Sequence, residues 1–166
     1  MTAEAEVRGE LRRLRARLPQ VTGALAASAD GLVLASETEA AGEAEHVAAL
    51  TAAALGVALR LTEATEQGSF RELLIRGDSG YVATYAAGPA AVLTLLAGPR
   101  TNVGRLHLEA RRSGARIGEL IKGALERPAP APMTAPAPVP RKPDRPPSLA
   151  GPATGGPADP AAGEPD

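Results

Sequence analysis

The sequence predicts an α/β fold of the α+β type, with elements in the order helix, two strands, helix, three strands, helix. Three observations support this order. Apolar residues recur at helical spacing in three segments, an Asp-Gly pair separates two short apolar runs, and glycine- or proline-bearing turns separate three more. These elements end near residue 127, so we predict one folded domain over residues 1–127 and a separate tail over residues 128–166.

The composition of the tail sets it apart. Only Pro19, Pro89 and Pro99 of the 16 prolines precede residue 128. A segment so rich in proline, with alanine and glycine between the prolines, cannot bury enough apolar surface to offset the entropy lost on ordering. We therefore predict a disordered Pro/Ala-rich tail with extended, polyproline-like stretches.

The first helix and the hairpin that follows are predicted from spacing and turn residues. Over residues 3–18 a narrow apolar stripe repeats every three or four residues, and Pro19 ends the helix. The apolar runs 21–28 and 32–36 then flank Asp30-Gly31. An Asp-Gly pair favours a hairpin because both residues tolerate positive φ.

The second helix, over residues 44–66, is apolar on nearly all sides. Between Val47 and Leu61 its only polar side chains are Thr51 and Arg60. A helix of this kind must be buried on two sides. Its own sheet can cover one side, and the other side needs a partner, which favours a dimerising or scaffolding module. One apolar stripe of this helix consists of Val47, Leu50, Ala54, Val57 and Leu61. Ala48, Leu55, Ala58 and Leu59 lie on the flanks of this stripe.

The last three strands differ in their expected burial. The run 90–98 is apolar at nearly every position and should be the strand buried on both faces. The run 70–77 carries Arg71, Glu72 and Arg76, and charges of this kind protect an edge strand from random pairing. The strand between them covers residues 80–87. Thr101 or Asn102 can cap the final helix, which we expect to end near Leu125.

Charge and composition exclude several classes of function. Residues 1–127 hold 15 acidic and 15 basic side chains, so there is no net basic field for nucleic acid. The chain has no cysteine, and no apolar run was expected to approach the length of about 20 residues that spans a membrane. The first 18 residues are too charged for a secretory signal. We therefore expect a cytoplasmic protein with no nucleic-acid partner and no direct membrane insertion.

A search for catalytic chemistry ends without a candidate. The two histidines, His46 and His107, belong to different predicted helices, and no cluster of metal ligands accompanies either of them. The sequence contains no phosphate-binding glycine loop and no nucleophile-elbow motif. Gly114 and Gly118 indicate close packing of the last helix. We predict no catalytic, cofactor-binding or metal-binding residue and no cofactor, and hence a protein that is not an enzyme.

The chain resembles the Roadblock/LC7 (dynein light chain 7) family, in the bacterial form that accompanies small Ras-like GTPases. The hairpin GALAASADGLVLAS, the helix AEHVAALTAAALGVALRL and the stretch GYVATYAAGPAAVLTLLAGPRTNVGRLHLEARRSG carry the resemblance. It covers about residues 7–125. No single string is diagnostic, and their order and spacing together are specific.

The resemblance implies a five-stranded antiparallel sheet with the second helix on one face and the first and third helices on the other. It also implies a homodimer in which the edge strands pair and the second helices lie side by side. The corresponding dimer contacts are Phe70, Arg71, Glu72, Leu73, Ile75, Leu50, Ala54, Val57 and Leu61.

The function implied by the resemblance is that of a non-enzymatic adaptor or regulator of a Ras-like small GTPase, in a signalling system that can include a histidine-kinase-like protein. Exposed groups near the dimer seam, His46, Thr51 and Arg60, are the expected GTPase contacts, and the alternative contact surface is the basic side of the first and last helices. The alternative is a ligand-sensing module of the PAS or GAF kind. That alternative is disfavoured because Phe70, Tyr81 and Tyr85 are the only aromatic residues available to line a pocket.

Overall fold

The computed structural model describes residues 2–38, 42–127, 151 and 155–156. The chain divides into two units, Met1–Ala129 and Pro130–Asp166. Almost all of the second unit lies outside the described residues, so the disordered tail remains a prediction.

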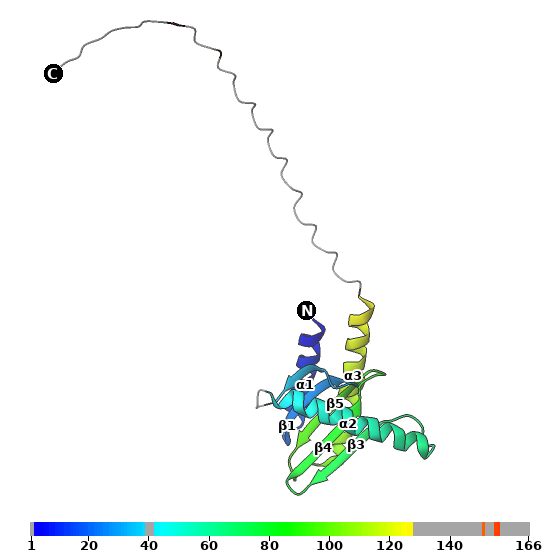
Figure 1. Cartoon of the computed structure of the whole chain (residues 1–166). Coiled ribbons are helices and arrows are strands. Elements are labelled where there is room, and N and C mark those ends of the chain that lie inside the picture. Colours follow the sequence, from blue (N-terminus) through cyan, green and yellow to red (C-terminus); the bar gives the residue numbers. More distant parts are fainter. Residues whose placement is uncertain (1, 39–41, 128–150, 152–154, 157–166) are drawn as a thin grey trace, which may run out of the picture. The chain divides into compact units, whose positions relative to one another are not determined.

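The order of elements is the predicted one, and their bounds differ from the predicted bounds by a few residues. Along the chain they are α1 (Ala3–Arg17), β1 (Val21–Ser28), β2 (Val33–Glu37), α2 (Glu43–Ala64), β3 (Glu72–Gly77), β4 (Gly80–Ala86), β5 (Ala91–Ala97) and α3 (Val103–Glu126) (Figure 1). Asn102 caps α3, since its side-chain oxygen accepts a hydrogen bond from the Arg105 backbone N–H at 2.9 Å.

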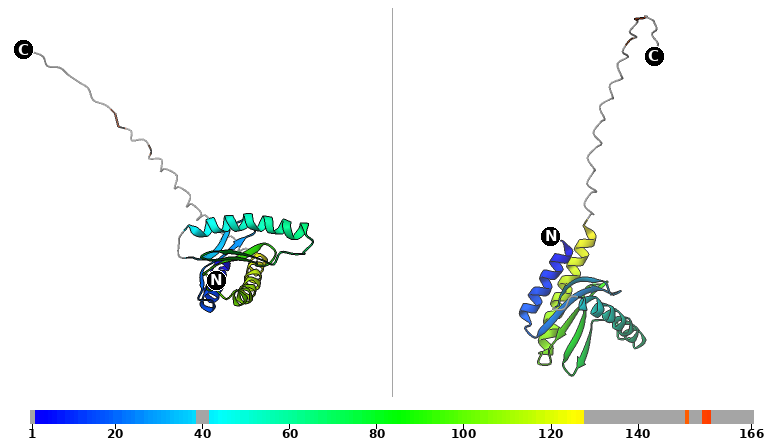
Figure 2. Two further views of the ribbon diagram at one scale, coloured as in Figure 1. Left: turned by 90° about the horizontal axis from the view of Figure 1, so that it is seen from below. Right: turned by 60° about the vertical axis from the view of Figure 1, so that its left-hand side comes forward.

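The five strands form one antiparallel sheet in the order β2-β1-β5-β4-β3. Strand β5 is therefore central and almost wholly buried, and β3 is an edge strand, as predicted. Helix α2 lies on one face of the sheet, and α1 and α3 lie on the other (Figure 2). This arrangement confirms the predicted fold class.

The larger hydrophobic core lies between the sheet and the α1–α3 pair. The apolar stripe of α1 meets Leu93 and Leu95 of the central strand and Leu106 and Ile117 of α3. All of these side chains are fully buried. The core on the α2 side is smaller and consists of Leu25, Ala27, Ala48, Leu55 and Val92. Most of the packing energy of the domain therefore lies on the α1–α3 side.

Glycines allow two close approaches. In the β1–β2 turn only Gly31 takes a positive φ, +95°, and a Cβ atom there would lie 3.2 Å from the Ala52 Cβ of α2. Where α3 crosses the β4–β5 hairpin, a Cβ on Gly114 would lie 2.8 Å from the Ala86 carbonyl oxygen, and one on Gly118 would lie 2.8 Å from the Gly88 nitrogen. The predicted close packing of Gly114 and Gly118 is confirmed, and the surface they meet is the sheet.

Candidate interaction surface

Helix α2 packs on the sheet through only one of its apolar sides. The buried residues are Ala44, Ala48, Thr51, Leu55 and Ala58. Ala48, Leu55 and Ala58 are among the residues that the sequence placed on the flanks of the stripe Val47, Leu50, Ala54, Val57 and Leu61, and this flank is the side that faces the sheet. At about 100° of rotation per residue, the stripe of Leu50, Val57 and Leu61 lies roughly a third of a turn away from the buried one. The small alanines let the helix backbone approach the sheet closely, and the larger side chains are left on its flank.

Thr51 is not on the surface, which corrects its assignment as an exposed contact. Its side chain is buried, 3.5 Å from the Thr94 hydroxyl, and the Thr94 hydroxyl is 3.1 Å from that of Thr84. These three hydroxyls satisfy one another in a largely apolar interface. Thr51 therefore helps to hold α2 on the sheet and cannot reach a partner.

The flank of α2 is an exposed apolar surface. Leu50, Val57 and Leu61 are 58%, 60% and 59% exposed, and Ala54 is half-buried beside them. Exposed apolar side chains that line up on one side of a helix mark an interaction site rather than scattered surface residues. We call Leu50, Ala54, Val57 and Leu61 the α2 flank.

The same helix meets the length and hydropathy expected of a membrane span. Glu43–Ala64 has 22 residues and an apolar window with a mean hydropathy of 1.5. We expected no apolar segment to approach the length of a membrane span, and this expectation was therefore wrong. Composition alone does not make it a span, because here its buried stripe packs on the β-sheet.

Among the described residues, no strand pairs with the outer edge of β3. The Ala86 N–H donates to the Arg71 carbonyl at 3.0 Å, and β3 continues in antiparallel register with β4 from Glu72 opposite Tyr85. Hydrogen-bonded and non-hydrogen-bonded pairs alternate in such a ladder. The N–H and C=O groups of Glu72, Leu74 and Arg76 therefore point away from β4, toward the open side of the sheet.

The side chains of β3 alternate between the two faces of the sheet. Leu73 and Ile75 lie opposite Thr84 and Val82, on the face that carries α2. Ile75 is 48% exposed, and it borders a shallow hollow of about 520 Å³ with Val82 and Leu96. Helix α2 thus leaves part of the sheet uncovered at β3, on the face of the sheet that carries α2. This uncovered region adjoins the outer edge of β3.

The predicted contacts Phe70 and Arg71 lie just before β3. Phe70 is half-buried and packs on the core beneath α2, so part of its side chain serves the protomer itself. Arg71 is exposed. Sequence reasoning missed Leu74, which is 37% exposed at the middle of the edge. The alternation of the ladder is the signal that identifies it.

Glu72 is already engaged within the protomer. Its carboxylate accepts hydrogen bonds from Arg111 of α3, one of them from Nε at 2.8 Å, and lies 4.0 Å from His107 Nδ1. The hydrogen bonds from Arg111 hold the pKa of the Glu72 carboxyl below its usual range. This cluster connects the start of the edge strand to α3.

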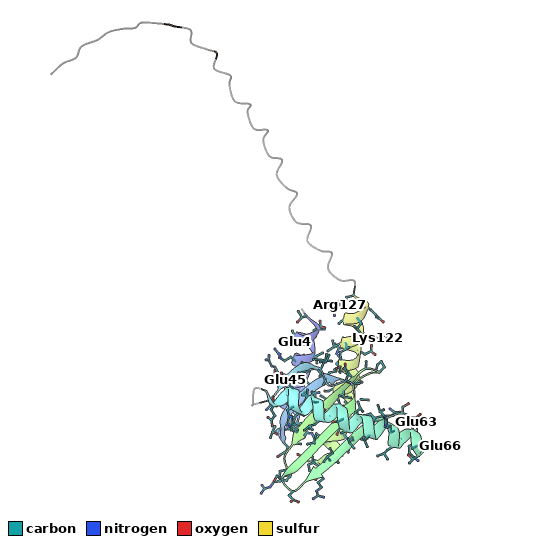
Figure 3. All side chains as sticks on the ribbon, viewed as in Figure 1. Glu4, Glu45, Glu63, Glu66, Lys122 and Arg127 are labelled. Atoms are coloured by element: carbon teal, nitrogen blue, oxygen red, sulfur yellow. The ribbon has the colours of Figure 1, made fainter. Side chains whose placement is uncertain are left out.

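His46 and Arg60 are exposed on α2, as expected. They are 14 positions apart, which is about 21 Å along a helix at 1.5 Å per residue. They cannot form one compact site. Figure 3 shows the exposed acidic residues of this helix, Glu45 near its start and Glu63 near its end.

The structure contains no catalytic arrangement among the residues it describes. Within residues 2–38 and 42–127 no group of three His, Asp or Glu side chains could hold a metal ion. A hollow of about 910 Å³ between α3 and the β4–β5 turn is lined by small residues of the turn, by the paired Arg111 and Glu72, and by charged side chains of Arg71, Glu119 and Lys122. Tyr85 is the one aromatic residue in its described lining, so it lacks the aromatic walls that are typical of a ligand-sensing pocket.

Comparison with known proteins places this geometry in a family. The profile of the Roadblock/LC7 domain matches residues 8–97. An uncharacterized protein of Methanocaldococcus jannaschii is 29% identical over 97 residues, which cover 58% of this chain and 84% of the relative.

Solved structures show the same fold. Gliding protein MglB from Thermus thermophilus superposes with a TM-score of 0.69 at 18% identity, over 75% of this chain and 94% of the other. A Roadblock/LC7 domain from Streptomyces avermitilis gives 0.66 at 23% identity, over 69% and 97%. The family profile covers more than half of the chain, and the element order and sheet topology agree with it: the chain belongs to the Roadblock/LC7 domain family.

Proposed function

We propose that this protein is a non-enzymatic, homodimeric adaptor that regulates a Ras-like small GTPase in the cytoplasm, within a signalling system that includes a histidine-kinase-like protein. The observation that supports it best is that one protomer has both an exposed apolar α2 flank and an open edge at β3. Both surfaces lack a partner among the described residues, and Phe70, just before β3, packs on the core beneath α2. A second copy of the chain can satisfy both at once.

The sequence of β3 suits pairing with itself. Glu72 and Arg76 are equally distant from Leu74, and all three present their backbone groups to the open edge. In an antiparallel pair with its two-fold axis at Leu74, Glu72 of each copy lies opposite Arg76 of the other. Leu73 then lies opposite Ile75. Opposite charges and apolar pairs directly across a ladder each contribute about 0.2–1 kcal/mol.

Such pairing gives the α2 flank a partner. Two α2 helices side by side would cover Leu50, Val57 and Leu61 of both copies. Full burial of one side chain of this size stabilises an assembly by about 1.5–3 kcal/mol. The α2 flank would then contribute more to the free energy of dimerisation than the charge pairs. The charge pairs would mainly set the register of the two β3 strands.

The GTPase contact is proposed at the outer side of the paired α2 helices, through His46 and Arg60. Thr51 is excluded because it is buried. No described acceptor holds the exposed Arg60 guanidinium, so it can contact a partner. Because the proposed role is that of an adaptor without catalytic groups, we propose that Arg60 contributes to binding and not to the chemistry of hydrolysis.

Light scattering tests the dimer. Val57→Arg would place a charge in the seam and should give a monomer with an unchanged circular dichroism spectrum, since Val57 is 60% exposed in the protomer. Glu63→Arg, at an exposed position on the same helix, is the matched control and should stay dimeric. A monomeric wild type at micromolar concentration would contradict the dimer.

Single-turnover GTP hydrolysis tests the regulatory role. The assay uses a Ras-like GTPase from the same organism, with and without saturating protein. Arg60→Ala should weaken binding and leave the rate at saturation nearly unchanged. Loss of an arginine finger would instead cost on the order of 10³-fold or more. A collapse of the saturated rate would make the protein a finger-type activator, and no binding at all would refute the GTPase partnership while leaving the dimer untouched.

A further inference from the structure

On the outer surface of α1 and α3, two carboxylates lie beneath the arginines that contact them. The side chains of Arg13 and Arg112 are 60% and 68% exposed, whereas those of Glu10 and Glu109 are only 9% and 15% exposed. Between Arg105 and Arg116 the one carboxylate of α3, Glu109, therefore lies mostly beneath the arginines, whereas Glu119, exposed on the same side of the helix seven positions after Arg112, lies beyond this stretch. We call Arg13, Arg105, Leu108, Arg112 and Arg116 the basic face.

Three of these guanidinium groups are held by oxygen atoms on their protein-facing side. Arg13 Nε donates to Glu10 at 3.1 Å, Arg112 lies 3.7 Å from Glu109, and Arg105 donates to the Arg17 carbonyl at 3.0 Å. A guanidinium has five N–H donors in a planar fork, and one carboxylate uses two of them at most. The remaining donors are left for anionic oxygens on the solvent side.

An exposed leucine lies within this charged stripe. Leu108 is 50% exposed, and it is three residues after Arg105 and four before Arg112, so all three share one face of α3. Arg116 continues the stripe by one more turn. Because Leu108 lies between arginines, this surface offers a partner both an apolar side chain and positive charge.

Charge is distributed unequally between the two faces of the sheet. Helices α1 and α3 together hold nine arginines and one lysine against six glutamates. Helix α2, on the other face, holds Arg60 against Glu43, Glu45 and Glu63. The basic face therefore points away from the α2 side.

We propose that the basic face docks the protein peripherally on a surface of anionic phospholipids. The phosphate oxygens would accept from the outward N–H groups, and Leu108 would enter the boundary between headgroups and acyl chains. The charge is spread over two helices, and both described hollows are lined by residues outside the basic face. Such a surface responds to charge density rather than to the shape of a peptide. No helix enters the bilayer.

Vesicle sedimentation with the full chain tests this proposal. The probes are vesicles of phosphatidylcholine alone and of phosphatidylcholine with an equal part of phosphatidylglycerol. The wild type should pellet with the anionic vesicles only, and added salt should release it. Reversing Arg112 and Arg116 together to Glu should lower the apparent affinity about tenfold or more. The control is Arg100→Glu, at an exposed residue outside the basic face and outside the proposed dimer seam, and it should lower the affinity less than Arg112→Glu alone.

Further variants distinguish a loss of binding from a loss of the fold. Arg112→Gln with Arg116→Gln removes the charge without setting a new carboxylate beside Glu109, and it should also weaken binding. Leu108→Ser should weaken binding, whereas Leu32→Ser, at a 66% exposed leucine of the β1–β2 turn, should not. The proposal is overturned if the wild type fails to pellet or if the basic-face variants pellet equally well. Binding to polyglutamate without binding to anionic vesicles would indicate an acidic protein partner and would also overturn it.

Discussion

Tyr85 of β4 and His107 of α3 are joined by a hydrogen bond of 2.8 Å between Oη and Nδ1. Tyr85 is buried, and its burial, together with the negative charge of nearby Glu72, raises the pKa of its hydroxyl. Because Arg111 also holds Glu72, this cluster ties the start of β3 to α3. The edge that we propose for dimerisation is thus fixed by α3 on the opposite face from α2.

Tyr85→Phe should lower the stability of the protein. The change removes one buried hydrogen bond and leaves His107 Nδ1 without its partner, at a cost of about 1–2 kcal/mol. Urea unfolding should show a lower midpoint with an unchanged m-value. Tyr81→Phe is the control, since the Tyr81 ring is half-buried over Arg76 and its hydroxyl has no partner among the described contacts. Equal midpoints for the two variants would argue against a role for the Tyr85–His107 bond.

Arg76→Glu should weaken the proposed dimer more than Arg76→Gln. Both variants lose the contact of Arg76 with the Tyr81 ring, at 5.9 Å, but only the glutamate places a like charge opposite Glu72 of the other copy. With two such pairs per dimer, we expect a rise in the dissociation constant of about tenfold over the glutamine variant at low salt. Analytical ultracentrifugation measures it, and the difference should shrink as salt is added. Equal constants for the two variants would rule out the register centred on Leu74.

Glu10 should make the stability of the domain depend on acid pH. Burial by itself raises the pKa of this carboxyl, but hydrogen bonds from Ser113, Arg13 and Arg17 outweigh that effect and place the pKa below the usual 4.5. A carboxyl whose pKa is lower in the folded state stabilises the protein above its unfolded pKa. That contribution is lost as the pH falls through the folded-state value.

Glu10→Gln should therefore cost about 1–2 kcal/mol at neutral pH and flatten the loss of stability below about pH 4.5. Thermal unfolding across the acid range measures both effects. Glu4→Gln, at an exposed residue paired with Arg8, is the control and should leave the acid transition nearly unchanged. If Glu10→Gln unfolds with the wild-type pH profile, Glu10 is not the group responsible.

Ending the chain after Arg127 should leave the fold and the dimer intact. The composition of residues 128–166 motivates this prediction, and every core residue in the part of the chain that the structure describes lies before residue 122. Differential scanning calorimetry should give thermal midpoints within a few degrees of each other. A larger fall, on the order of 1 kcal/mol or more for a domain of this size, would mean that the tail contributes to stability.

Several elements could be predicted from the sequence because their signals are local. Pro19 ends α1, Gly31 turns the first hairpin, and the arginines and glutamate of residues 70–77 mark an edge strand wherever that strand is placed. The family resemblance was likewise readable from short strings and their order. The α2 flank was also named from spacing alone, since Leu50, Val57 and Leu61 share one side of any helix.

The amino-acid sequence alone therefore establishes the order of the elements, the edge position of β3 and the presence of a helix with more apolar surface than one sheet can cover. It could not determine which side of α2 is buried, because a helix that is apolar nearly all round has no amphipathic preference to decide the matter. The tertiary structure decided it in favour of Ala48, Leu55 and Thr51, because small residues allow close contact with β1 and the Thr94 hydroxyl gives Thr51 a partner across the interface. The burial of Glu10 beneath Arg13 also depends on Ser113, which lies more than a hundred residues away in the chain.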